Sequence, residues 1–395
     1  MDIRRLIPFI DPSVSQWAVE ARLLRWLTFL WLFIGLAMLF SASYGIEEAS
    51  KDWLYLVNRQ LLGIILGLVA FNILVHSPLQ QILRISGWVV LSLLGLIFLT
   101  KILGTDANGA TRWLPIGTGR TIQPSELIKP FLILQSARIF GQWHKLRWQL
   151  RLGWVVIFAL VLLGILVQPN LSTTALCGIT LWLVALAAGL SYLVLGGTAL
   201  LGVVLAGASV HVNPYQLERL TSFRNPWADP MGQGYQLTQS LYAIGSGSIS
   251  GTGFGLSQQK LSYLPFHHTD FIFSIFAEEF GFIGSLLFLL LIVTYATVAL
   301  IVALKTKNAV HRLVAIGAMV LIVGQSILNI GVAIGVLPTT GLPLPFVSHG
   351  GNSMIASLII TALLIRVSRE STEADIVPLA DKSHFKSSLK KPRDI

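Results

Sequence analysis

Apolar residues occur in long, nearly uninterrupted runs from Leu27 to Val367, and short polar segments separate the runs. A helix needs about 20 apolar residues to cross the hydrocarbon core of a bilayer. In lipid, every backbone polar group must be bonded within the protein, which favours helices. The pattern predicts ten transmembrane helices, at residues 27–45, 56–75, 84–101, 124–141, 152–168, 171–189, 191–210, 271–303, 312–335 and 347–367.

The fold class expected is therefore an all-α integral membrane protein with a large loop, residues 211–270, between helices 7 and 8. Composition agrees, because 54% of the 395 residues are hydrophobic and only 12% are charged. In soluble domains about a quarter of the residues are charged. We expect one polytopic membrane domain, residues 26–370. The single cysteine, Cys177, lies within an apolar run and excludes a disulfide framework or a cysteine metal site.

The two ends of the chain are more polar than the runs between them. Residues 1–25 are basic, and Trp17 and Leu24 could share the apolar face of a short interfacial helix. The segment 371–395 is rich in Ser, Lys and Pro, a composition typical of a disordered tail.

Loop charges predict the orientation, because cytoplasmic loops carry an excess of Lys and Arg. If the N-terminus is cytoplasmic, the inner segments hold eighteen Lys and Arg residues and the outer segments hold seven. The seven are Lys51, Lys101, Arg112, Arg120, Arg219, Arg224 and Lys260. Both termini are thus predicted in the cytoplasm, with the 211–270 loop outside. The net charge of +10 reflects this topology and does not indicate a nucleic-acid partner.

The outer loop contains a glycine-rich stretch at residues 245–255. Glycines permit positive φ and close backbone approach, and successive N–H groups can cradle an anion. Two interpretations remain open: a mobile loop that meets a phosphate-bearing substrate, and a flexible connector. A nucleotide-binding fingerprint is not indicated, because no strand precedes these glycines.

Asp270 ends the outer loop, immediately before a long apolar run. One interpretation is helix capping, with Thr269 as the N-cap and Asp270 in the first turn. Capping does not explain the acids that follow, of which only Glu278 could share a helix face with Asp270 at about 100° per residue. Acids within membrane segments are candidates for functional sites. His267 and His268 are adjacent, a poor geometry for joint metal ligation, and surface histidines are the expected interpretation.

Two further charged groups lie at predicted outer ends of helices. Glu126 and Lys129 open the fourth span at i, i+3 spacing, either as an internal ion pair or as a pair lining a cavity level with Asp270. Arg112 and Trp113 precede that span and suit an interfacial anchor.

Many motifs, in order, resemble the SEDS family of bacterial cell-wall proteins, of the FtsW and RodA type. The resemblance covers about residues 20–370. The segment Gly234–Ser240 is closer to the division branch, FtsW, than to the elongation branch. The motifs include Gly109–Trp113, Gln123–Glu126, Gln168–Asn170, Ala243–Gly247, His268–Phe273, Leu337–Gly341 and Leu344–Gly351.

The resemblance implies a ten-helix peptidoglycan glycosyltransferase in the bacterial plasma membrane, acting at the division septum. It would polymerise lipid II, an undecaprenyl-pyrophosphate-linked disaccharide peptide. A class B penicillin-binding transpeptidase and other division proteins would be its partners. Two alternatives are kept: a lipid II flippase, and a non-catalytic scaffold for the transpeptidase.

The resemblance also implies roles for particular residues. The essential carboxylate falls on Asp270, which would act as the catalytic base or bind a divalent cation, Mg²⁺ or Mn²⁺, together with Glu126. No organic cofactor is implied. The chain departs from the family pattern in having Asn170, His349 and Asn352 in place of Asp, Tyr and Ser. The candidate substrate-binding residues are Lys129, Glu126, Arg112, Trp113, Lys260 and His268.

Overall fold

A computed structural model of the chain describes residues 11–44, 53–107, 110–117, 120–261 and 263–376. Ten long helices occupy the ten predicted spans. Eight are long and apolar enough to cross a membrane; α6 is shorter, and α4 carries the predicted charged pair. The helices are α1 (Val19–Tyr44), α2 (Trp53–His76), α3 (Leu79–Leu103), α4 (Pro124–Gly141), α5 (Trp148–Val167), α6 (Leu171–Ala187), α7 (Tyr192–Val212), α10 (Ile272–Lys305), α11 (Ala309–Ala333) and α12 (Gly351–Ile376).

The predicted multi-pass helical fold is thus confirmed, with two additions. The 211–270 loop contains two helices, α8 (Pro214–Arg224) and α9 (Tyr235–Ser246). A small antiparallel sheet in the order β1–β2–β3 lies between α3 and α4, and the sequence analysis did not predict it. Its strands are β1 (Thr105–Ala107), β2 (Ala110–Ile116) and β3 (Arg120–Ile122).

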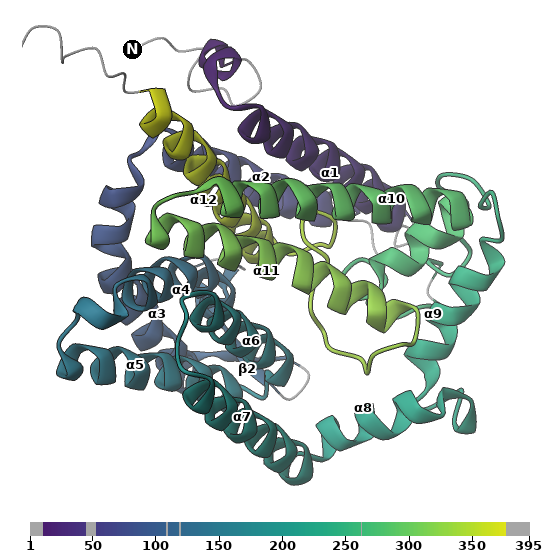
Figure 1. The fold of residues 1–395 in the computed structure, drawn as a ribbon. Helices are drawn as coiled ribbons and strands as arrows, with labels where there is room; N and C mark the ends of the chain where they lie inside the picture. Colours follow the sequence, from purple (N-terminus) through teal and green to yellow (C-terminus); the bar gives the residue numbers. More distant parts are fainter. Residues whose placement is uncertain (1–10, 45–52, 108–109, 118–119, 262, 377–395) are drawn as a thin grey trace, which may run out of the picture.

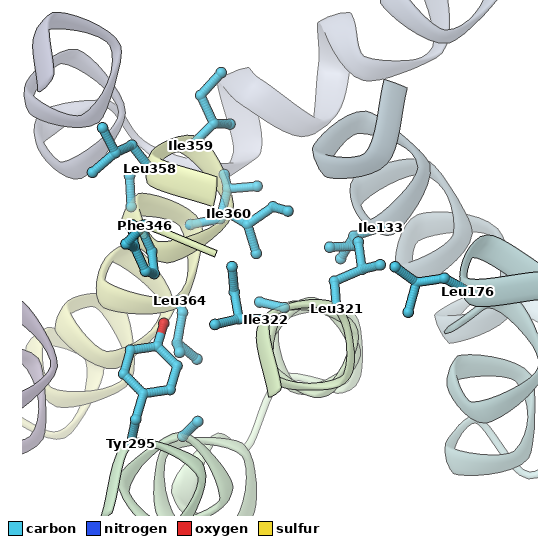
Figure 2. Packing of buried hydrophobic residues seen from close by; sticks show 14 of the residues in the cluster. Ile133, Leu176, Tyr295, Leu321, Ile322, Phe346, Leu358, Ile359, Ile360 and Leu364 are labelled. Atoms are coloured by element: carbon cyan, nitrogen blue, oxygen red, sulfur yellow. The ribbon is translucent and has the colours of Figure 1, made fainter. Parts of the chain in front are cut away.

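The bundle core surrounds α11, which contacts α4, α6, α10 and α12. Figure 2 shows Leu321 and Ile322 of α11 between Ile133 of α4 and Leu364 of α12. At the edge of this cluster, the Tyr295 hydroxyl lies 2.9 Å from the hydroxyl of Thr361. This apolar packing fixes the relative positions of α4, α10 and α11, the helices that carry or adjoin the candidate site residues.

Both ends of the chain differ from the predicted boundaries. Helix α1 begins at Val19 and continues into the first span, and Trp17 and Leu24 are both buried. The separate interfacial helix is therefore wrong for the described residues. At the other end α12 continues to Ile376, and residues 377–395 of the predicted tail lie outside the described part. The start of α1 and the end of α12 lie at one end of the bundle, opposite α9 (Figure 1).

Helix α10 is broken at Gly281, where φ is 64° and ψ is −163°. The glycine-rich loop fills the break. The amides of Thr252 and Gly253 donate to the carbonyls of Glu278 and Glu279, at 2.9 and 3.0 Å. Across the break, the amides of Phe282 and Ile283 donate to the carbonyls of Ser248 and Ile249, at 2.9 and 3.1 Å.

The glycines allow this close backbone approach. A Cβ on Gly251, where φ is 82°, would lie 2.2 Å from the Glu279 carbonyl oxygen, and one on Gly247 would lie 2.1 Å from that of Ala277. Segment 247–253 is therefore a packed insert that completes the hydrogen bonds of a broken helix. The flexible-connector interpretation does not describe it, and contact of this loop with a phosphate-bearing substrate stays a prediction.

Gly281→Ala is expected to destabilise the protein, because a side chain at this φ and ψ costs about 1–3 kcal/mol. Its Cβ would also lie 2.3 Å from the Gly251 amide nitrogen. Thermal unfolding of the purified variant measures the effect. Gly245→Ala is the control: it lies within α9 with no atom within 4 Å of an added Cβ, and a gain of up to about 1 kcal/mol is expected. Equal melting temperatures for the two variants would contradict the tight fit at the break.

Candidate active site

Asp270 lies just before α10, outside the helix. The N-cap position is Phe271, with no side-chain capping bond, and the Thr269 hydroxyl donates to the carbonyl of Phe266 at 3.2 Å. The capping interpretation of Thr269 and Asp270 is therefore wrong. The position of the Asp270 carboxylate is set by the surrounding chain instead.

Main-chain hydrogen bonds hold the Asp270 segment against the loop between α11 and α12. The amide of His349 donates to the carbonyl of His268 at 2.8 Å, and the Ser348 hydroxyl donates to that of Thr269 at 2.5 Å. The Asn329 side chain donates to the carbonyl of Asp270 at 2.9 Å. These bonds use backbone groups and leave the carboxylate for other contacts.

Two arginines from distant segments act on that carboxylate. Arg219 belongs to α8 and Arg112 to β2, and both attract the negative charge of Asp270. Gly341 lies between two of the groups: a Cβ added there would be 3.6 Å from Asp270 Oδ2 and 3.7 Å from Arg219 Nη1. Burial nevertheless raises the pKa of Asp270 above its ordinary value, because desolvation outweighs the attraction of the two guanidinium groups.

Both guanidinium groups are anchored to backbone carbonyls. Arg112 Nε donates to the carbonyl of Gln168 at 3.1 Å, and Arg112 Nη2 donates to that of Pro169. Arg219 Nη1 donates to the carbonyl of Thr339 at 3.3 Å. The positive charges near Asp270 are thus held in fixed positions. The neighbouring Trp113 is partly buried in β2, paired with Thr105.

Glu126 and Lys129 form the predicted pair inside the bundle. Lys129 Nζ lies 2.6 Å from Glu126 Oε1, and the two side chains are only 2% and 5% exposed. Lys129 Nζ also donates to Gln325 Oε1 at 3.0 Å. Glu126 Oε2 is buried and has no hydrogen-bond partner among the described residues.

Helix α11 connects this pair to the Asp270 segment through two amides one turn apart. Gln325 Nε2 donates to the carbonyl of Pro343 at 2.7 Å. Asn329 Nδ2 donates to the backbone carbonyl of Asp270 and also to that of Leu342 at 2.8 Å. Gln325 thus contacts the ion pair, Asn329 contacts the carboxylate segment, and both hold the same loop.

Lys260 has a different environment. Its ammonium group lies 2.9 Å from Glu279 Oε1 and donates to the Ser41 hydroxyl at 2.9 Å. Glu278, which the helical spacing placed near Asp270, instead accepts bonds from the Ser257 hydroxyl and from the amide of Gln258 at 3.0 Å. Both glutamates therefore hold the outer segment against the bundle, and the predicted substrate contact of Lys260 stays a prediction.

The histidines near Asp270 are buried or partly buried. His267 is 7% exposed, and its ring nitrogens lie 2.9 Å from the Leu264 carbonyl and 3.2 Å from that of Ala42. The interpretation as surface histidines is wrong for this residue. The rings of His268 and His349 are 6.0 Å apart, and burial lowers the pKa of each to about 4. Both are neutral at pH 7, so His268 could contact substrate only as an uncharged ring.

Two of the departures from the family pattern make structural hydrogen bonds. Asn170 is the N-cap of α6, and its side chain accepts from the amide of Thr173 at 3.3 Å. Asn352 donates to the carbonyl of Thr121 at 3.3 Å. Neither bond points to a catalytic role.

Three site residues were missed by the sequence analysis: Arg219, Gln325 and Asn329. Arg219 was counted only as an outer charge. The two amides lie four residues apart in an apolar helix, a spacing that puts them on one face, and this was the signal that could have identified them.

Carboxylate oxygens that could take part in holding a divalent cation are present, and the cation itself stays a prediction. Among the described residues, no three His, Cys, Asp or Glu side chains are close enough to hold a metal. Mg²⁺ is commonly bound by one or two carboxylates together with substrate phosphates and water. Asp270 and the unpartnered Oε2 of Glu126 are the oxygens available for it.

Comparison with known proteins agrees with the fold. The structure resembles a solved structure described as "Structural coordination of polymerization and crosslinking by a peptidoglycan synthase complex", with a TM-score of 0.70, 28% identity, and coverage of 88% of this chain and 97% of that chain. It also resembles the rod shape-determining protein RodA of Thermus thermophilus, with a TM-score of 0.65, 26% identity, and coverage of 88% and 96%.

Sequence relatives are closer. A Synechocystis protein named "Probable peptidoglycan glycosyltransferase FtsW" is 52% identical over 383 residues, which cover 96% of this chain and 97% of the relative. The family model described as "Cell cycle protein", for FtsW, RodA and SpoVE, matches residues 21–373. The chain is therefore a multi-pass membrane protein that belongs to the FtsW, RodA and SpoVE family, on its FtsW branch.

Proposed function

We propose that this protein is a peptidoglycan glycosyltransferase that polymerises lipid II into glycan strands during cell division. The observation that carries the proposal is the carboxylate of Asp270, a half-buried residue, which two anchored guanidinium groups attract. The carboxylate can accept a proton, and the two guanidinium groups can stabilise a departing pyrophosphate. The Synechocystis relative supports this assignment by its name and by its 52% sequence identity to this chain.

The reaction assigned to this site is an inverting glycosyl transfer. A hydroxyl oxygen of the acceptor sugar attacks the anomeric carbon of the donor, forming the new glycosidic bond. The bond from that carbon to the pyrophosphate oxygen breaks, and polyprenyl pyrophosphate leaves as an anion. Asp270 accepts the hydroxyl proton as general base.

Positive charge near the leaving group lowers the barrier, because it stabilises the negative charge that develops there. Arg112 and Arg219 both attract the charge of Asp270 and are fixed by backbone carbonyls. Lys129 is bonded to Glu126 and Gln325, and we assign it to the deep side of the site. A bound Mg²⁺ or Mn²⁺ would supply further positive charge at the pyrophosphate, held by Asp270 and Glu126.

The proposal includes a location and partners. The protein lies in the bacterial plasma membrane at the division septum, with both termini in the cytoplasm and the Asp270 side outward. It acts with a class B penicillin-binding transpeptidase and other division proteins. The loop charges support this orientation, and the start of α1 and the end of α12 lie opposite α9 (Figure 1).

The test is polymerisation of lipid II by the purified protein, with and without the transpeptidase. Glycan polymers resolved by gel electrophoresis are the expected product, in larger amount with the partner. Lipid II movement across vesicles without polymer would replace the proposal with a flippase. Absence of both polymer and movement, with transpeptidase binding retained, would replace it with a scaffold.

A further inference from the structure

A basic pocket lies at the end of the bundle opposite Asp270, where α3 begins, α4 ends and α11 begins. It has a volume of about 510 Å³. Arg138, at this end of α4, is twelve residues from Glu126, which corresponds to about 18 Å along a helix. The pocket is therefore separate from the candidate active site. Its polar lining consists of Gln80, Arg84, Arg138, Gln142, Lys145 and Asn308, with His311 at the edge of α11.

The lining has strong positive charge. It contains three cationic side chains, and none of the described residues that line it is acidic. Arg138 Nη1 donates to the carbonyl of Leu83 at 3.0 Å, which fixes one guanidinium group, while Arg84 and Lys145 are exposed. The pocket therefore suits a ligand with at least one negative charge.

Glu370, an acid next to His311, is already bonded elsewhere. Glu370 Oε1 accepts from Arg366 Nε at 2.8 Å and from the amide of Leu79 at 2.7 Å. Its other oxygen lies 3.5 Å from His311 Nδ1. Glu370 thus bonds to the first turn of α3 and to the basic residues around it. It does not line the pocket.

Tryptophans beside the pocket are typical of the level of the lipid headgroups. Trp143 lies two residues from Lys145, and the guanidinium of Arg151 stacks over its ring at 5.5 Å. Trp148 is 67% exposed at the start of α5. Trp residues next to basic residues are typical of the boundary between bilayer and water. A lipid phosphate at this boundary could reach the pocket from the side.

We propose that this pocket binds the phosphate-bearing headgroup of an anionic phospholipid, from the leaflet on the side where α4 ends and α11 begins. Basic pockets between transmembrane helices on the cytoplasmic side are suited to such headgroups. The headgroup phosphate would be bound by two guanidinium groups and one ammonium group of the pocket. The inference is independent of the glycosyltransferase proposal, because no residue of the Asp270 site takes part.

The test is native mass spectrometry of the purified full chain with phosphatidylglycerol, compared with phosphatidylcholine of the same acyl chains. The wild type should retain phosphatidylglycerol preferentially. Arg84→Gln with Lys145→Gln should weaken this binding about thirty-fold, about five-fold for each basic residue near the surface. Both residues are exposed, so folding should be unaffected, and thermal unfolding checks this. Lys145→Gln alone is the milder second variant.

The matched control is Arg147→Gln with Arg312→Gln, two exposed basic residues on the same side that do not line the pocket. This control should bind like the wild type. Equal retention of the two lipids, or an equal loss in the control, would overturn the proposal by showing general surface attraction. Direct binding of inorganic phosphate that displaces phosphatidylglycerol at millimolar concentration would also overturn it, and would assign the pocket to a soluble phosphate compound.

Discussion

Asp270→Asn is expected to reduce lipid II polymerisation by at least about 100-fold, the lower end for losing a positioned proton acceptor. The structure separates this loss from instability, because the α10 N-terminus has no side-chain capping bond. The backbone bonds to Asn329 and the α11–α12 loop are retained in the variant. Expression, melting temperature and transpeptidase binding should therefore stay close to wild type.

The control is Glu218→Gln, which neutralises an exposed carboxylate on α8 next to Arg219 and should leave the rate unchanged. The pH dependence gives a second measurement. The pKa of Asp270 is raised by burial, so lowering the pH protonates the base, and the wild-type rate should fall at a higher pH than for an ordinary aspartate. The residual rate of Asp270→Asn should lack this fall. Near-normal polymerisation by Asp270→Asn would remove Asp270 from the catalytic role and favour a flippase or scaffold.

Lys129→Met is expected to cost about 3–5 kcal/mol of stability, because breaking a buried ion pair leaves an uncompensated charge. Here that charge is Glu126, whose second oxygen already has no partner among the described residues. Thermal unfolding of the purified protein measures the loss. The double variant Glu126→Gln with Lys129→Met removes both charges and should recover most of the stability.

The activity of the double variant then separates a structural role of the pair from a catalytic one. If the pair belongs to the active site, the stable double variant should still polymerise poorly. Lys305→Met is the matched control, because Lys305 and Glu20 form an ion pair in which the lysine side chain is 65% exposed, and such pairs contribute about 0–1 kcal/mol. A double variant with both normal stability and normal activity would limit the pair to a structural role.

The sequence was sufficient for the ten helices because each needs only a sufficiently long apolar run. It was not sufficient for the break in α10. Gly281 lies in a continuous apolar run from Phe280 to Ile283, and a glycine there is compatible with an unbroken helix. The break depends on segment 247–253, which supplies backbone groups from about 30 residues away. Local pattern contains no information about that pairing.

The contacts of the candidate site were likewise predicted only in part. The Glu126 and Lys129 pair follows from helical spacing, and the structure confirms that contact. Arg219 and Asn329 could not be connected to Asp270, because α8 and α11 reach it only through tertiary packing. Lys260 had the appearance of an outer basic residue, yet Ser41 and Glu279 enclose it.

The break at Gly281 bears on how the enzyme responds to bilayer thickness. A helix of 34 residues would be about 51 Å long if straight, whereas the hydrocarbon core is about 30 Å thick. Such an excess is normally relieved by tilting or kinking. Here the break divides the excess: the part after Gly281 is about 36 Å long, close to the thickness of the hydrocarbon core. The membrane therefore has to match only this part of α10, and the part next to Asp270 is held by the outer segment on the far side of the break.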